Sequence, residues 1–151
     1  IVGDGDLKKK AETIIKAHKI KNVLFTGSLP HDEVYKYILN CDVYVSLNKL
    51  GNLSNTVLEA INAERCLILL KKSITTLRDI STYQFFNDSV LYINKKNIVN
   101  DLEKIIRYLI SNPEIIKLKR ELIKKKSSKI LSWRDRVKEE IRIIQKVASN
   151  D

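Results

Sequence analysis

The chain has 151 residues, of which 44% are hydrophobic and 30% are charged, a composition typical of a folded globular protein. Its length suits one domain with a sizeable core. The longest apolar stretches, such as Cys66–Leu70, have the length of strands and fall far below the ~18 apolar residues that a membrane-spanning helix needs. We therefore expect a single soluble domain over residues 1–151.

The charge is strongly basic, because 28 Lys and Arg residues stand against 18 Asp and Glu residues and leave a formal net charge of +10. Such a charge attracts nucleic acids, phosphorylated ligands or an anionic membrane surface. Most of the excess lies between Arg107 and Lys146, in segments that resemble helices, where lysines commonly form a solvated face. The alternating aromatic and basic residues of a nucleic-acid platform are not visible, so we expect no nucleic-acid partner. A peripheral contact with a membrane stays open.

The sequence opens on Ile1-Val2-Gly3 and contains no methionine. This start has neither an initiator residue nor a signal peptide, and we expect the beginning of the protein to lie upstream. The two cysteines, Cys41 and Cys66, lie 25 positions apart without the spacing of a zinc or redox site. We expect both to be buried thiols.

The first third of the chain alternates short apolar runs with amphipathic segments. Ile1-Val2 is typical of the end of a strand, and the turn Gly3–Asp6 leads into a helix with apolar residues at helical spacing. A β-rich run over 22–26 then closes on Gly27 and is followed by a helix that begins near Asp32. This order is strand, helix, strand, helix.

The alternation continues along the chain. We expect strands over Asp42–Leu47, Cys66–Lys71 and Ser89–Ile93, and between the first two a helix over Ser54–Ala63 with Ser54 as its N-cap. Three more helices are expected at the end, separated by breaks at Asn112-Pro113 and at Ser127-Ser128, over Ile98–Ser111, Pro113–Lys126 and Trp133–Ala148.

Strands separated by helices indicate βαβ units, and hence an α/β fold of the Rossmann-like type, with an open parallel sheet, helices on both faces and additional helices at the C-terminal end. Such sheets bind their ligands outside the carboxyl ends of the strands. The turns after Val2, Thr26 and Leu47 are therefore the places where a site is expected.

A helix that begins at Ser54 points the backbone N–H groups of Asn55, Thr56 and Val57 and the positive end of its dipole at whatever lies before it. Small residues, among them Gly51, allow a ligand to approach this backbone closely. The pattern predicts an anion site that suits a nucleotide diphosphate.

Two segments of this region resemble one family. Asp42-Val43-Tyr44-Val45 followed by Asn55-Thr56-Val57-Leu58-Glu59-Ala60 is similar, in order and spacing, to the core of the C-terminal domain of glycosyltransferase family 4, which has the two-Rossmann-domain (GT-B) architecture. Ile1–Gly5, Val23–Gly27 and Trp133 resemble other parts of that domain, so the resemblance covers nearly the whole chain.

The resemblance implies a role for each turn. Glu59 would accept hydrogen bonds from the ribose hydroxyls, although a solvated helix glutamate is the alternative. Ser28 and Leu29 would lie against the nucleobase, and Gly3 and Gly5 would lie beneath the sugar and phosphates, although plain tight turns are the alternative for both pairs. The expected donor-binding residues are Gly3, Gly5, Ser28, Leu29, Gly51, Asn52, Leu53, Ser54, Asn55, Thr56 and Glu59.

The sequence departs from the family pattern at three positions. Gly51 stands where many members have a second glutamate that contacts the transferred sugar. Glu64 replaces the usual glycine after the helix and Cys66 replaces the usual proline, so we expect the helix end to lack its left-handed residue. The family's phosphate-binding Arg and Lys belong to a segment that would lie upstream of Ile1.

These features predict the donor-binding half of a retaining glycosyltransferase that moves a sugar from a nucleotide diphosphate sugar to a glycan or lipid-linked acceptor. The expected setting is polysaccharide biosynthesis in the cytoplasm. The inner face of the membrane is an alternative location for the enzyme. We expect neither a cofactor nor a metal, no catalytic residue in this chain, and no activity of the chain without the N-terminal domain. The alternative is a non-catalytic module that kept the fold and lost transfer.

Overall fold

The structure is a computed structural model that describes residues 1–48, 53–71, 84–129 and 133–149. The chain divides into two compact units, Ile1–Cys41 and Asp42–Asp151, and each is described by itself. The expectation of a single domain over residues 1–151 stays a prediction.

The first unit contains two helices, α1 (Lys8–Ala17) and α2 (His31–Asn40). The sequence predicted strands at 1–2 and 22–26, and this prediction is wrong, because neither segment forms part of a ladder. In their place, one antiparallel bridge joins Gly3 to Gly27, and the N–H of Thr26 donates to the carbonyl oxygen of Ile1 over 3.1 Å. The physical reason is burial: Leu24 is 62% exposed in this unit, whereas a parallel strand is stable when both of its faces are covered.

The second unit is built on a parallel sheet of three strands in the order β1, β2, β3. These strands are β1 (Val43–Ser46), β2 (Cys66–Lys71) and β3 (Leu91–Asn94). The central strand is β2, in which Cys66, Leu67 and Ile68 are fully buried. Such a continuous apolar run fits a strand that is covered on both faces.

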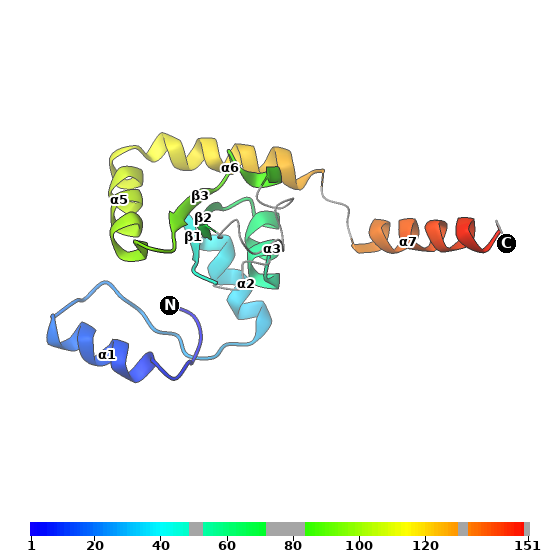
Figure 1. The fold of residues 1–151 in the computed structure, drawn as a ribbon. Coiled ribbons are helices and arrows are strands. Elements are labelled where there is room, and N and C mark those ends of the chain that lie inside the picture. Colours follow the sequence, from blue (N-terminus) through cyan, green and yellow to red (C-terminus); the bar gives the residue numbers. More distant parts are fainter. Residues whose placement is uncertain (49–52, 72–83, 130–132, 150–151) are drawn as a thin grey trace. The chain divides into compact units, whose positions relative to one another are not determined.

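Helices of this unit pack against both faces of the sheet (Figure 1). They are α3 (Asn55–Asn62), α5 (Ile98–Ser111) and α6 (Pro113–Ser127), and a final helix, α7 (Trp133–Ala148), follows. Side chains alternate along a strand, so Cys66, Ile68 and Leu70 point to the same face, where they pack with Leu109 of α5. Leu67 points to the opposite face, and α3 buries its own apolar residues, including Ile61. The expected α/β fold, with an open parallel sheet between helices, is confirmed.

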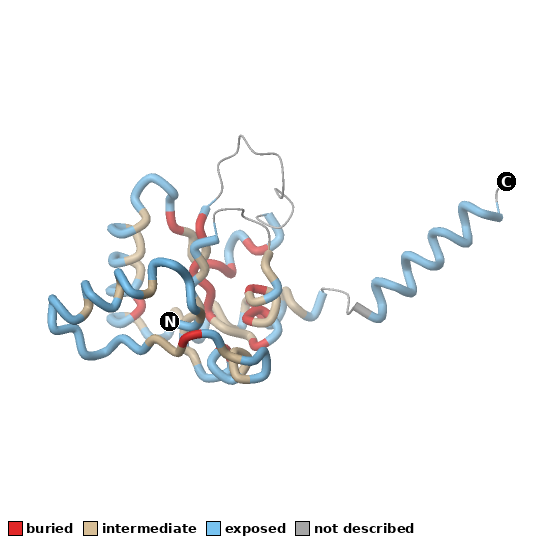
Figure 2. Tube along the Cα trace, turned by 90° about the horizontal axis from the view of Figure 1, so that it is seen from below, coloured by how far each residue is buried: buried red, intermediate tan, exposed pale blue. Residues whose placement is uncertain are grey.

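Buried residues gather on the strands and on the inner side of α3, as Figure 2 shows. Cys66 belongs to this core, as expected, whereas Cys41 is half-buried. Among the described residues, no helix is both long enough and apolar enough to cross a membrane.

The C-terminal end of α3 has a left-handed residue, so the expectation that it would lack one is wrong. Glu64 has a φ of 55°, so it occupies the left-handed position that the missing glycine was expected to leave empty. The N–H of Arg65 donates to the carbonyl oxygen of Ala60 over 3.0 Å, and the N–H of Glu64 donates to that of Ile61 over 2.9 Å. This is the Schellman arrangement of hydrogen bonds, formed here at the cost of placing a side chain where glycine is preferred. Lys19, with a φ of 53°, ends α1 in the same way.

Candidate functional site

The N-terminal end of α3 lies at the carboxyl edge of the sheet. β1 ends at Ser46 and α3 connects it to β2, which runs parallel to β1 and beside it. The helix between two such strands runs in the opposite direction, so its first residues return to the edge where β1 ends. The expected site residues Gly51 and Asn52 precede this helix and lie outside the described residues.

Ser54 caps α3, as the sequence predicts. Its backbone is extended, and its Oγ accepts a hydrogen bond of 3.4 Å from the N–H of Val57. The hydroxyl groups of Ser54 and Thr56 lie 3.0 Å apart and form a second hydrogen bond. Because the N–H of Val57 is engaged by the cap, Asn55 and Thr56 provide the N–H groups that have no acceptor within the helix. These two groups face the space in front of the helix together with the positive end of its dipole.

Glu59 lies one turn into the same helix. The residue is half-buried and its Oε2 is shielded from solvent. It is four residues after Asn55, and residues at this spacing share one side of a helix. The neighbouring residues Val57 and Ala60 are buried in the core and fix the rotation of the helix. The structure therefore brings a carboxylate and a helix N-terminus together, and the half-buried Leu53 lies just before the cap.

The remaining expected residues lie in the first unit. Gly3 has a φ of 122° and its N–H donates a hydrogen bond of 2.9 Å to the carbonyl oxygen of Gly27, which has a φ of 71°. Both values belong to the region of backbone space that strongly favours glycine. Ser28 is exposed and Leu29 is half-buried, and they follow Gly27 directly. The bridge thus places the turn that contains Gly3 and Gly5 beside the turn that carries Ser28 and Leu29.

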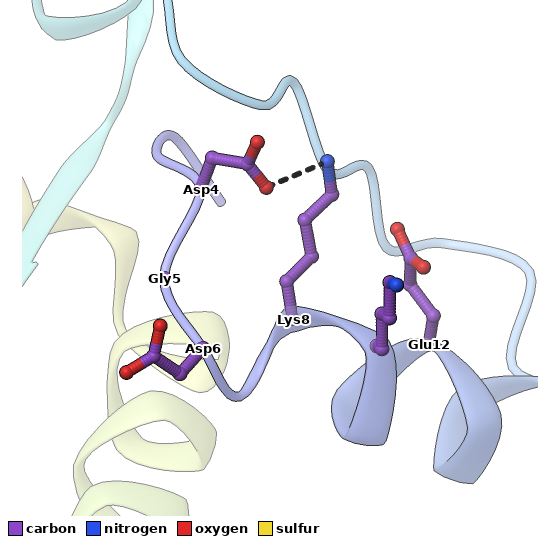
Figure 3. Close-up of a pocket in the computed structure, with 6 residues that line it drawn as sticks. Asp4, Gly5, Asp6, Lys8 and Glu12 are labelled. Carbon is purple, nitrogen blue, oxygen red and sulfur yellow. Dashed lines mark ion pairs between the residues drawn. The ribbon is translucent and has the colours of Figure 1, made fainter.

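An open pocket of about 560 Å³ lies at this glycine turn (Figure 3). Lys8, in the first turn of α1, reaches back along the pocket, and its Nζ lies 3.2 Å from the carboxylate of Asp4. A methyl group added to Gly27 would come within 3.4 Å of the same Nζ, so the ammonium group lies over Gly27. The residues that line the pocket are Asp4, Gly5, Asp6, Lys8, Lys9 and Glu12.

Sequence reasoning missed Lys8. The available signal was its place four residues after Asp4, directly behind the glycine turn, which allows an ion pair across the first turn of the helix. Its position over Gly27 depends on the bridge between Gly3 and Gly27, and this bridge joins segments that lie far apart in the sequence.

The expected site residues therefore form two groups, one in each unit, and each group offers a distinct chemistry. The group in the second unit can bind an anion at a helix N-terminus and accept hydrogen bonds from hydroxyl groups at Glu59. The group in the first unit offers glycine backbone, an ammonium group and carboxylates. Within the described ranges, no group of three or more His, Cys, Asp or Glu side chains is placed to hold a metal ion, and the expectation about cofactors stays a prediction.

Comparison with known protein families identifies the family of this chain. The family model described as glycosyl transferases group 1 matches residues 1–129, a range that includes both groups of site residues and ends before α7. Neither the curated proteins nor the solved structures include a match to this sequence. Because the matched range is most of the 151 residues, the chain belongs to the group 1 glycosyltransferases.

Proposed function

We propose that the chain is the donor-binding, C-terminal half of a retaining GT-B glycosyltransferase of family 4. It binds a nucleotide diphosphate sugar, whose sugar is transferred to a glycan or lipid-linked acceptor held mainly by the other half of the enzyme. The observation that carries this proposal is the pairing of a capped helix N-terminus at the carboxyl edge of a parallel sheet with a half-buried carboxylate one turn inside the helix.

The diphosphate would lie in front of α3. The N–H groups of Asn55 and Thr56 donate to phosphate oxygens, and the helix dipole stabilises their negative charge. Glu59 would then accept hydrogen bonds from the ribose hydroxyls. A carboxylate is a strong acceptor for two neighbouring hydroxyl groups, because its two oxygens lie in one plane and both carry lone pairs.

The resemblance also assigns donor-binding roles to the glycine turn of the first unit. Gly3 and Gly5 present backbone without side chains, so the sugar and phosphates can approach closely. Ser28 and Leu29 would contact the nucleobase. Lys8 provides a cation in the pocket at this turn and would donate from Nζ to a phosphate oxygen of the donor.

The contribution of this half to transfer would be stabilisation of the leaving nucleotide and positioning of the sugar. Negative charge develops on the diphosphate as the bond to the sugar breaks, and fixed donors aimed at that charge lower the barrier. The half that holds the acceptor completes the reaction geometry. We therefore propose that residues 1–151 alone bind the donor nucleotide without transferring sugar, and we place the enzyme in the cytoplasm, in polysaccharide biosynthesis.

Calorimetric titration with UDP, GDP and ADP tests the binding, and the 2′-deoxy form of the nucleotide that binds tests the ribose contact. The unsubstituted chain should bind the deoxynucleotide more weakly than the ribonucleotide. Glu59→Ala should weaken binding of the ribonucleotide by about 1–3 kcal/mol and should bind both forms with similar affinity, because the shared contact is gone. Glu103→Ala on α5 removes an exposed helix glutamate and is the matched control.

Two outcomes would contradict the proposal. The first is the absence of binding to all three nucleotides, and the second is a Glu59 variant that still prefers the ribonucleotide. Nucleotide binding by a full-length protein that transfers no sugar would instead favour the non-catalytic module.

A further inference from the structure

The last turn of α3 is held by a side chain of another helix. Arg120 of α6 is half-buried, and its Nε donates a hydrogen bond of 3.2 Å to the backbone carbonyl oxygen of Glu64. Lys124, on the same helix, lies 3.3 Å from the carboxylate of Glu64, and both of these side chains are exposed. Of these two contacts, the bond from Arg120 is the one that acts directly on the backbone at the end of α3.

The end of α3 needs a contact of this kind. The helix has eight residues, and helices of this length are marginal without contacts to the rest of the protein. Its buried residues Val57, Ala60 and Ile61 pack in the core, but apolar burial is non-directional and does not by itself fix the last turn. Glu64 also has a left-handed φ of 55°, which is unfavourable for a residue with a side chain. A directional hydrogen bond at this residue therefore determines where the last turn lies.

Glu59 belongs to the turn that this bond fixes. Its carbonyl oxygen accepts a hydrogen bond of 2.8 Å from the N–H of Ala63, the residue directly before Glu64. The opposite end of α3 has its own anchor, because the hydroxyl group of Ser54 accepts a hydrogen bond from the N–H of Val57. A displaced last turn would therefore move the Glu59 side chain and leave the N–H groups at the start of the helix in place.

We propose that Arg120 is a positioning residue for the donor. By holding the carbonyl oxygen of Glu64, it places the carboxylate of Glu59 where that group can accept hydrogen bonds from the ribose hydroxyls. Arg120 acts through α3 and requires no contact with the nucleotide. The inference rests on the proposed ribose contact of Glu59 and adds a residue of α6 that determines how well this contact is made. A purely structural role of Arg120 predicts a different result, namely equal weakening of every nucleotide.

Two substitutions of Arg120 separate its hydrogen bond from its charge. Arg120→Met keeps a side chain of similar length without an N–H donor, whereas Arg120→Gln removes the charge but has an N–H donor at the same distance along the side chain as Nε. Each variant of the full chain is titrated with UDP, GDP or ADP, whichever the unsubstituted chain binds, and with its 2′-deoxy form. Arg120→Met should reduce the preference for the ribonucleotide roughly threefold to tenfold, the effect of one hydrogen bond on an equilibrium constant, and should change the affinity for the deoxynucleotide little. Arg120→Gln should retain most of the preference.

Lys119→Met is the matched control. Lys119 is also a half-buried cation of α6, and its Nζ donates to a backbone carbonyl oxygen, that of Asp88, over 2.6 Å. Because Asp88 lies before β3 and outside α3, this variant should keep the preference for the ribonucleotide. Equal weakening of the two nucleotides by Arg120→Met would overturn the proposal. An equal loss of preference in Arg120→Met and Arg120→Gln would also overturn it, because the charge and not the hydrogen bond would then be responsible.

Hydrogen exchange of the chain without nucleotide tests the positioning step itself. Arg120→Met should speed the exchange of the N–H groups of Ala63 and Arg65, which donate within the last turn of α3, and should leave that of Leu58, which donates to the cap residue, unchanged. Unchanged exchange at Ala63 and Arg65 would overturn the proposal. An unsubstituted chain that binds the two nucleotides alike would refute the ribose contact and this inference with it, whereas a preference that survives in Arg120→Met would refute the positioning role alone.

Discussion

The Nε of Arg120 donates a hydrogen bond of 3.2 Å to the backbone carbonyl oxygen of Glu64, and so α6 holds the residue that ends α3. Lys124, one turn further along α6, adds an ion pair of 3.3 Å with the carboxylate of Glu64. Both contacts act on a residue in the left-handed backbone conformation. The strained end of α3 is therefore stabilised from a neighbouring helix.

Replacement of Glu64 by glycine should stabilise the chain relative to replacement by alanine. Both variants lose the exposed ion pair with Lys124, which contributes little, but only glycine removes the strain of a left-handed residue. We expect a difference of about 1 kcal/mol in the free energy of unfolding, measured by urea titration with circular dichroism. Equal stability of the two variants would show that the left-handed conformation is not strained.

Asp88 should make stability depend on pH in the acid range. The hydrogen bond from the ammonium group of Lys126 and a backbone hydrogen bond lower the pKa of Asp88 below its ordinary value of 3.8. A lowered carboxyl pKa contributes stability that is present above 3.8 and is lost as the pH falls through the lower value of the folded state. Asp88→Asn should therefore reduce the melting temperature at neutral pH, and its difference from the unsubstituted chain should shrink in acid.

Glu103→Gln is the control for this measurement, because its ion pair with Arg107 also involves an exposed carboxylate. That pair lies within one helix and joins no second segment, whereas Lys126 also donates to the carbonyl oxygen of Phe85 over 2.5 Å and so attaches α6 to the segment before β3. We expect a smaller effect of the control at neutral pH. An effect of Asp88→Asn that does not change between neutral pH and strong acid would contradict the assignment.

Ser54 allows the stability of α3 and its ligand binding to be separated. Ser54→Ala should cost about 1 kcal/mol of stability, because it removes the N-cap. Ser54→Asp should retain the cap and the stability but weaken the binding of a nucleotide diphosphate roughly fivefold or more, since like charges about 4 Å apart near a protein surface repel by about 1–4 kcal/mol. Calorimetry with the nucleotide and thermal unfolding give the two values. Unchanged nucleotide affinity of Ser54→Asp would place the phosphates elsewhere.

Lys8→Gln should weaken the binding of the same nucleotide by about 1.5–3 kcal/mol, the usual contribution of a hydrogen bond to a charged group. The glutamine keeps most of the length of the side chain and removes the charge from the pocket. Lys16→Gln, in the last turn of α1, changes the same helix by one charge and is the control. If both variants bind alike, Lys8 serves only its ion pair with Asp4.

The sequence predicts the helices well because their apolar spacing is regular. The bounds expected for Ile98–Ser111 and Trp133–Ala148 agree with α5 and α7, and the strand Cys66–Lys71 is β2. The strand expected over 89–93 begins two residues later in the structure. The N–H groups of Ser89 and Val90 both donate to the carbonyl oxygen of Phe86, and a residue engaged in such a turn cannot join a parallel ladder.

The features that the sequence could not predict arise from contacts between distant segments. Nothing in the local sequence of Glu64 shows a left-handed residue, since its conformation depends on the Schellman hydrogen bonds and on Arg120. In the same way, the position of Lys8 in the candidate site follows from the bridge between Gly3 and Gly27. The glutamate and the cap of α3 could be predicted, because both are properties of one helix.

The registers of the sheet have a consequence for the order of folding. Val43 pairs with Cys66 and Ile68 pairs with Leu91, so both ladders join residues that lie 23 positions apart in the chain. Loop-closure entropy depends on this separation, and it therefore favours neither ladder over the other. Both ladders share β2, so we expect the side chains of this strand to determine the folding rate. Substitutions that shorten its buried side chains, such as Ile68→Val, should slow folding through either route, whereas exposed positions of α7 should leave the folding rate unchanged.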